Sequence, residues 1–295
     1  SERTEVRVLY TSTTLYIGVI CFDRDPSGIV TANPRRDGAL DETDSVRLIL
    51  DTYRDGQSGF VFGTSPSALE YDAQVINEGQ GGSMMSGQAG GSGGGFNINW
   101  DGTWQVATST HAEGWTAEFA IPFRTLRYPD APDQQWGFNL QRNIRRRNET
   151  GFWAELPQQY GLNRLSLAGT LTGLQIPQQR NLKFYPYVLG LSRNPAATDR
   201  TVSKGEIGLD AKYSLTPSLT LDVTVNTDFA QVEIDEQQVN LDRFTLFFPE
   251  KRPFFLENAG LFSVGSPGEA EIFFSRSIGI GPNGEPIPIL GGARL

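Results

Sequence analysis

The chain has 295 residues, of which 38% are hydrophobic and 20% charged, so it can bury a core and does not have the composition of a disordered chain. A formal net charge of −9 argues against a nucleic-acid-binding protein, because such proteins need a basic face. The single cysteine excludes an intrachain disulfide and a cysteine-based zinc site, and the single histidine argues against Ser-His-Asp hydrolysis and two-histidine metal sites.

The first strands are predicted within residues 5–22, where two short apolar runs flank a polar turn. The second run is apolar on both faces, which is typical of a central strand in a sandwich. Cys21 belongs to this run and is predicted to be a small core residue rather than a nucleophile. One face of the run holds Leu15, Ile17, Val19 and Cys21, and the other holds Tyr16, Ile20 and Phe22.

Strand patterns then recur at short intervals and predict a β-sandwich. Between them, residues 79–95 contain nine glycines in seventeen positions and no lysine, which favours a surface loop over a phosphate-binding loop. His111 falls at a turn between two of the strands. The strand candidates are residues 43–51, 59–66, 68–77, 103–110, 114–123, 134–149 and 150–156.

The composition changes near residue 177, so we predict a sandwich domain over residues 1–176 and a second domain over 177–295. Residues 205–215 and 219–229 each alternate apolar and polar side chains for about ten positions. This pattern is typical of outer-membrane barrel strands, although a water-soluble hairpin with one wet face has it too. Further strands are predicted at 182–193, 271–280 and 286–295.

About five strands are fewer than the roughly eight that bacterial barrels need. The barrel is therefore predicted to be incomplete in this chain, which is a fragment, is completed by other chains, or forms no barrel. A Phe-rich insert spans about 230–265 and includes the stretch FFPEKRPFFLEN at 247–258. Its four phenylalanines are predicted to be buried, as a plug or a packing surface, because exposed they would form a sticky patch.

Two stretches carry a family resemblance. Residues 100–128, WDGTWQVATSTHAEGWTAEFAIPFRTLRY, resemble the signature of a family 9 carbohydrate-binding-module-like domain. Residues 225–262 resemble the start of the β-barrel domain that follows such modules in bacterial outer-membrane proteins. The resemblance implies an exported protein of the outer membrane or cell surface, with a jelly-roll-like sandwich able to hold sugars.

A sugar site combines an aromatic platform for the C–H face of the sugar with planar groups that bind its hydroxyls. The strand predicted at 134–149 alternates so that Arg142 and Arg146 share one face, with Gln141 and Asn143 on the other. The alternative is that the tryptophans are core residues and the arginines form surface ion pairs. The predicted sugar-binding residues are Trp100, Trp104, Trp153, Gln141, Arg142, Asn143 and Arg146.

Acidic residues cluster in two neighbouring stretches, FDRDP and DETD. Carboxylate oxygens on adjoining loops are ligands that Ca²⁺ prefers. The alternative is solvated loop charge, and no EF-hand spacing is present. The predicted calcium ligands are Asp23, Asp25, Asp41 and Asp44, and no other cofactor is expected.

These features favour a non-catalytic glycan-binding sandwich joined to a barrel-like outer-membrane domain. Its expected partners are a polysaccharide or oligosaccharide, the outer membrane and, if the sheet needs completion, other protein chains. One alternative is a structural scaffold or assembly subunit of a cell-surface complex or fibre. A second alternative is a glycoside hydrolase, which needs two carboxylates at a defined separation that sequence alone does not reveal.

Overall fold

The computed structural model describes residues 2–31, 35–80, 95–176, 182–193, 202–216, 219–226, 253–256, 265–266, 270–271, 275, 278–279, 287 and 289–295. Across these residues the protein is all-β, as predicted, with antiparallel sheets and no helix of seven or more residues. The chain divides into two compact units, residues 1–90 with 94–179 and residues 91–93 with 180–295. Their roles as a sugar-binding domain and a barrel domain stay predictions.

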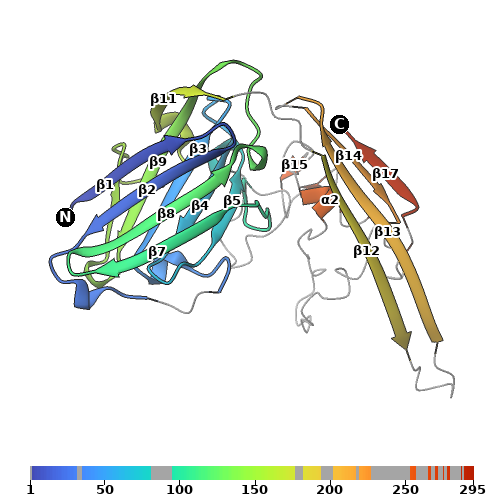
Figure 1. Ribbon diagram of the computed structural model, residues 1–295, viewed down its shortest axis with the longest axis horizontal. Helices are drawn as coiled ribbons and strands as arrows, with labels where there is room; N and C mark the ends of the chain where they lie inside the picture. Colours follow the sequence, from blue (N-terminus) through green and yellow to red (C-terminus); the bar gives the residue numbers. More distant parts are fainter. Residues whose placement is uncertain are drawn as a thin grey trace. The chain divides into compact units, whose positions relative to one another are not determined.

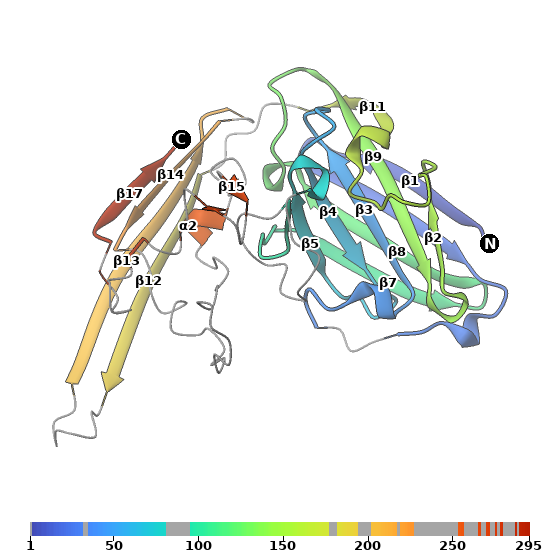
Figure 2. The same ribbon diagram turned by 180° about the vertical axis from the view of Figure 1, so that it is seen from behind.

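The first unit is a β-sandwich (Figures 1 and 2). Its four-stranded sheet has the order β1-β2-β8-β7, formed by β1 (Thr4–Tyr10), β2 (Thr14–Phe22), β8 (Gly114–Pro122) and β7 (Gln105–His111). Its seven-stranded sheet has the order β10-β9-β3-β4-β5-β6, and β11 also pairs with β9. These strands are β3 (Ser45–Asp51), β4 (Gly59–Thr64), β5 (Tyr71–Val75), β6 (Phe96–Asn97), β9 (Asp133–Ile144), β10 (Glu149–Phe152) and β11 (Gly169–Gln175).

Short single-turn helices punctuate the loops of this unit. They are 3-10 turns at Pro26–Gly28, Leu40–Glu42, Asn77–Gly79, Phe123–Thr125, Arg145–Arg147 and Leu165–Leu167. The predicted strand at 134–149 is therefore too long. β9 ends at Ile144, the arginines turn, and Asn148 adopts a left-handed conformation before β10 begins. Arg146 lies in that turn and not on the face of the strand.

The main core lies between the two sheets, where the inward residues of the alternating strands meet. β2 is a central strand, as its sequence predicts, but only the face with Leu15 and Ile17 is buried, and Tyr16 on the other face is exposed. Cys21 is fully buried in this core, and burial raises the pKa of its thiol to about 12, so it is a packing residue.

A second, smaller core covers the outer face of the seven-stranded sheet. β4 and β5 are consequently buried on both faces. This explains why β4 is apolar at nearly every position, whereas β5 also buries the polar residues Asp72 and Gln74. The covering side chains come from loop segments and include Leu40, Leu69, Leu162 and Leu165. The central strands β3, β4 and β5 of the seven-stranded sheet are therefore covered on both faces, β10 and β11 at its edge remain largely exposed, and the four-stranded sheet keeps one face in water.

The second unit contains an antiparallel sheet with the order β12-β13-β14-β17. Its strands are β12 (Leu182–Arg193), β13 (Val202–Ser214), β14 (Thr220–Val225) and β17 (Gly291–Arg294). The hairpins predicted around 182–229 are confirmed, and the described strands form no closed barrel. The predicted strand at 271–280 is not formed by the described residues there, which contribute only the end of β16 (Ala270–Glu271), paired with β15 (Gly265–Ser266).

The Phe-rich insert is described only in part, through the short helix α2 (Pro253–Leu256) and residue 265. Phe254 and Phe255 are half-buried and pack edge to face, with ring centroids 5.0 Å apart. The Phe254 ring lies 5.4 Å from the guanidinium carbon of Arg294, beside Gly292 of β17. Phe254 and Phe255 are thus buried only in part, and the role as a plug or packing surface stays a prediction. Phe247 and Phe248 lie outside the described residues, as do 81–94 of the predicted Gly-rich loop.

Candidate functional site

Two of the predicted sugar platforms lie in the core of the sandwich. Trp100 and Trp104 are 8% and 5% exposed. Trp100 packs on Phe60, and Trp104 stacks on Phe119 with ring centroids 5.7 Å apart. In this fold their rings hold the two sheets together and do not present a face to a ligand.

Trp153 differs, because 55% of it is exposed. It follows β10, and its backbone N–H donates to the carbonyl of Leu140 at 2.8 Å. Its ring packs against Phe138, with centroids 5.5 Å apart, and lies over Gly169, where a Cβ atom would come within 2.3 Å of the indole. The glycine thus gives the indole a seat on the sheet, and the rest of the ring faces water.

The position of Trp153 follows from how β10 and β11 share one edge of β9. Phe152 of β10 pairs with Gln141, and Gly169 of β11 pairs with Phe138, so the chain leaves β10 in the gap between the two pairings. Asn139, which is buried, fills this gap from below. Its Oδ1 accepts from the N–H of Ala154 at 2.8 Å, and its Nδ2 donates to the Ala154 carbonyl at 3.2 Å. We call Phe138, Asn139, Trp153, Ala154 and Gly169 the Trp153 platform.

The polar residues predicted to bind sugar on β9 are used by the fold. Arg142 points between the sheets and donates to the carbonyl oxygens of Arg3 at 2.9 Å and Phe22 at 2.7 Å. Asn143, on the opposite face, donates to the carbonyls of Asp41 and Thr43. Gln141 is buried on the same face as Asn143. Alternation along β9 is as predicted, but none of these side chains lies on an open surface.

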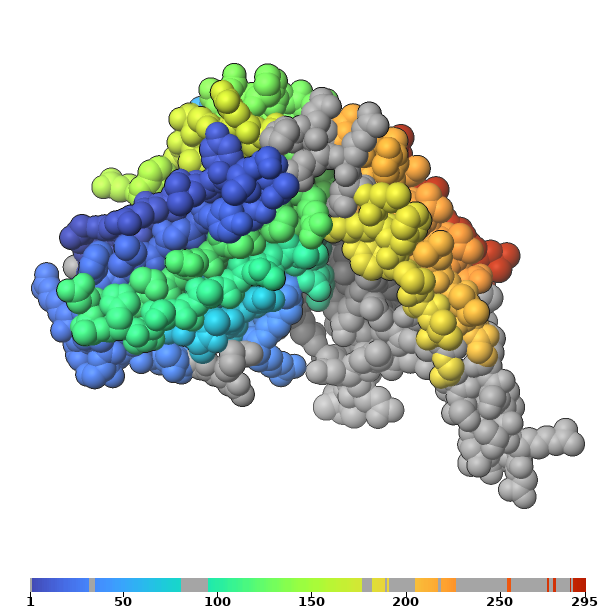
Figure 3. Space-filling view, in the orientation of Figure 1, coloured from blue at the N-terminus to red at the C-terminus, as the bar shows by residue number. Residues whose placement is uncertain are grey.

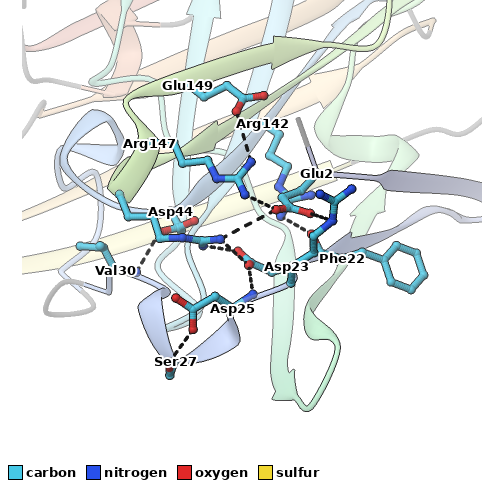
Figure 4. Close-up of polar contacts among 12 residues, drawn as sticks. Glu2, Phe22, Asp23, Asp25, Ser27, Val30, Asp44, Arg142, Arg147 and Glu149 are labelled. Atoms are coloured by element: carbon cyan, nitrogen blue, oxygen red, sulfur yellow. Dashed lines mark hydrogen bonds and ion pairs between the residues drawn. The ribbon is translucent and has the colours of Figure 1, made fainter.

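Arg146 joins a buried ionic cluster instead (Figure 4). Its guanidinium donates to both carboxylate oxygens of Asp23, at 2.5 and 2.6 Å. Beside it, Arg147 donates to Glu2 at 2.6 Å, and Glu2 also lies 3.9 Å from Arg146. We call Glu2, Asp23, Arg146 and Arg147 the Asp23 cluster. It connects the start of β1, the end of β2 and the turn after β9.

Electrostatics within the Asp23 cluster favour the charged pair. Burial opposes ionisation of Asp23, but the hydrogen bonds and positive charge of Arg146 outweigh it and hold the pKa of Asp23 below its usual range. Asp44, nearby, accepts the N–H of Val30 at 2.8 Å, and its pKa is raised, chiefly by burial. The predicted sugar ligand Arg146 is thus the partner of the predicted calcium ligand Asp23.

The predicted calcium ligands do not gather around a cation position. The Arg146 guanidinium occupies the position beside Asp23 that a metal ion would need. Asp25 accepts a hydrogen bond from the Ser27 hydroxyl at 2.6 Å. Asp41 pairs with Arg47 elsewhere on the surface. Among the residues that the structure describes, no group of three or more His, Cys, Asp or Glu is placed to hold a metal ion. Calcium binding stays a prediction that this geometry does not support.

A second group of carboxylates, which the sequence did not single out, surrounds Arg36. Asp72 is completely buried and accepts from Arg36 at 2.5 Å and from the N–H of Gly102 at 2.5 Å. Burial is the main reason that the pKa of Asp72 is raised to about 7. Glu70 and Asp101 also pair with Arg36. Because Asp72 has no exposed surface, it cannot donate a proton to a bound substrate, and we assign it to the fold.

Similarity to known proteins extends over parts of the chain. The model of a family described as a domain of unknown function (DUF5916) matches residues 178–289, which lie in the second unit. No curated protein matches the chain. Among solved structures, the chain is similar to a candidate carbohydrate-binding protein from Bacteroides uniformis ATCC 8492, with 11% identity and a TM-score of 0.41 over 58% of this chain and 78% of that one. With a TM-score this low, the ligand of the present chain has to be inferred from its own residues.

Proposed function

We propose that the sandwich is a non-catalytic carbohydrate-binding module and that Trp153 is its stacking platform. One observation carries this proposal: Trp153 presents an indole to solvent on a rigid seat of Gly169 and Phe138. An aromatic ring covers the C–H face of a sugar, and a ring that is already held in place loses little entropy on binding. Gly151 and Glu155, two residues to either side, are exposed, so there is room beside the ring and an acceptor for hydroxyls.

Replacing Trp153 with alanine is expected to weaken polysaccharide binding at least tenfold, because stacking on the indole is lost. Affinity electrophoresis in gels containing soluble β-glucan, xylan or galactomannan measures the effect. Tyr53→Ala removes another exposed aromatic of the sandwich and serves as the control that should bind normally. Unchanged migration of Trp153→Ala in every gel that retards the wild type, or no retardation of the wild type at all, would refute the platform.

For the second unit we infer attachment to the outer membrane through one face of its sheet. Residues at alternate positions of β12 and β13 are apolar and exposed, with Val188 at 79% and Ile207 at 70%. On the opposite face Thr224 is only 1% exposed, and Asp222 pairs with Lys212 and Arg294. A sheet of a water-soluble domain has the reverse distribution, whereas lipid-facing strands have this one. The apolar exposed residues are Leu182, Phe184, Val188, Ile207, Leu209 and Val225.

The lengths of the strands are compatible with this attachment. β12 has 12 residues and β13 has 13, and a tilted membrane strand needs about 9–11. Among the described residues, no helix has the length and hydropathy to cross a membrane.

An Ile207→Arg substitution is expected to reduce membrane association, since an arginine on a lipid face costs about 2–4 kcal/mol near the middle of the bilayer. Flotation of the full chain with phospholipid vesicles measures it, and Ile207→Leu is the control that should float with the membrane. If the wild type stays in the aqueous fraction as a large assembly, the face is covered by protein and the scaffold alternative replaces this one.

A further inference from the structure

A single glycine lies at the centre of the exposed face of the four-stranded sheet. Gly18 of β2 pairs with Arg7 on β1 and with Glu118 on β8. A Cβ atom built on it would approach nothing closer than the Arg7 carbonyl oxygen, at 4.0 Å. A glycine inside a strand costs roughly 0.5–1 kcal/mol and often marks a place where a ligand comes close to the backbone. The space above Gly18 therefore has no packing role in the fold.

The surface around Gly18 combines small side chains with one exposed aromatic ring. In the next row of the register, Leu9, Tyr16 and Ala120 lie side by side, and Tyr16 is 42% exposed. Beyond Glu118, Ala107 of β7 continues the row with a small side chain. This face is turned toward the viewer in Figure 3, with β1 in dark blue and β7 and β8 in green. We call Arg7, Leu9, Tyr16, Gly18, Glu118 and Ala120 the Gly18 face.

Two charged side chains flank the open space and are available for a ligand. Arg7 is exposed and makes only a 3.5 Å contact with Glu5 within the described residues. The Glu118 carboxylate is exposed and makes no hydrogen bond or ion pair in the same part of the chain. Their Cα atoms are separated by two strand spacings, about 9.5 Å. A guanidinium and a carboxylate on either side of Gly18 supply donors and acceptors at once.

We propose that the Gly18 face is a second carbohydrate contact surface, which takes a neutral oligosaccharide. Tyr16 stacks on a sugar ring seated above Gly18, Arg7 donates to its hydroxyls, and Glu118 accepts from them. Arg7 and Glu118, with the neighbouring pair of Arg3 and Glu5, add two positive and two negative groups and leave the face without net charge, which suits neutral sugars better than uronic acids. The exposed apolar residues of this face do not form one large area, because Arg7, Gly18, Glu118 and Ala120 lie around Leu9 and Tyr16, and Ile20 beyond Gly18 is half-buried. A protein or lipid partner would need a larger continuous apolar area. This inference rests on the proposed function and extends it from one platform to two.

A Gly18→Val substitution tests the surface without deleting any binding group. Valine suits a strand, so the fold is retained, while its methyl groups fill the space that the sugar would take. We expect Gly18→Val and Tyr16→Ala each to weaken binding of the full chain to β-glucan, xylan or galactomannan at least tenfold. Ser109→Val, on the same face but at the edge strand β7, should bind as the wild type does. Polygalacturonate should be bound no better than the neutral polymers.

The outcomes separate this inference from the proposed function. If Trp153→Ala abolishes binding while Gly18→Val and Tyr16→Ala bind normally, the Trp153 platform stands and the Gly18 face is refuted. If Gly18→Val weakens binding and Trp153→Ala does not, the Gly18 face is the site and the Trp153 platform is refuted. If the wild type binds none of the four polymers, both proposals fall. Tighter binding to polygalacturonate would refute the neutral ligand that the Gly18 face is proposed to take.

Discussion

Replacing Arg146 with alanine is expected to lower the free energy of unfolding of the sandwich by about 3–5 kcal/mol, the cost of leaving a buried charge without its partner. The Asp23 side chain is fully buried, and Arg146 binds both of its oxygens. Glu2, also buried, is 3.9 Å from the same guanidinium. Without Arg146, Asp23 would lose both of its guanidinium hydrogen bonds, and the positive charges left nearby would be Arg142 and the two arginines that pair with Glu2, Arg24 and Arg147. A loss of this size is a large part of the stability of an ordinary domain.

The neighbouring arginine provides a matched control. Arg145 pairs with Glu42 at 2.9 Å, but the Glu42 side chain is 69% exposed, so Arg145→Ala leaves no buried carboxylate without a partner and should cost less than about 1 kcal/mol. Urea unfolding followed by tryptophan fluorescence compares the two variants. All five tryptophans lie between residues 100 and 153, so the signal reports on the sandwich. Equal midpoints for Arg146→Ala and the wild type would show that the Asp23 cluster does not stabilise the fold.

Much of the fold could be predicted from the sequence, because alternation and turn residues determine strands locally. The strands at 114–123 and 182–193 were predicted to within a residue, and the two-sided apolar pattern of β2 placed it in the middle of its sheet. The same pattern did not reveal that its Tyr16 face would be open. Whether the outer face of a sheet is exposed depends on whether loops pack over it. The loops that pack over the seven-stranded sheet come from distant parts of the chain.

The candidate site was harder to predict because its residues meet only after folding. Composition pointed to tryptophans and arginines as groups that can bind a sugar. Which of them can reach a ligand depends on burial, and of the five tryptophans only Trp153 is exposed. Asp23 and Arg146 are 123 positions apart, so no local pattern pairs them. Likewise, Gly18 lies between Arg7 and Glu118 only through the register of three strands. The sequence shows which residue types are present, but which of them lie together depends on strand pairing between distant parts of the chain.

The stability of the sandwich is expected to fall as the pH rises from about 4 to about 7, with Asp72 as a main cause. Its pKa is about 7 in the folded protein, against an ordinary value of 3.8, and burial is the chief reason. The folded state therefore binds the proton more tightly than the unfolded state. Protonated Asp72 contributes stability that is fully present below pH 4 and is lost as the pH rises through 7. A shift of about three pKa units corresponds to about 4 kcal/mol.

Asp72→Asn isolates this contribution, since the amide keeps the shape of the side chain and carries no charge at any pH. The difference in unfolding free energy between wild type and variant should therefore change by about 4 kcal/mol between pH 4 and pH 8, in favour of the variant at the higher pH. Asp101→Asn, which removes an exposed partner of the same Arg36, is the control and should keep most of the wild-type slope. Urea titrations across this pH range measure the slope. Parallel curves for wild type and Asp72→Asn would mean that Asp72 is ionised in the folded protein at neutral pH, with Arg36 and the Gly102 N–H outweighing its burial.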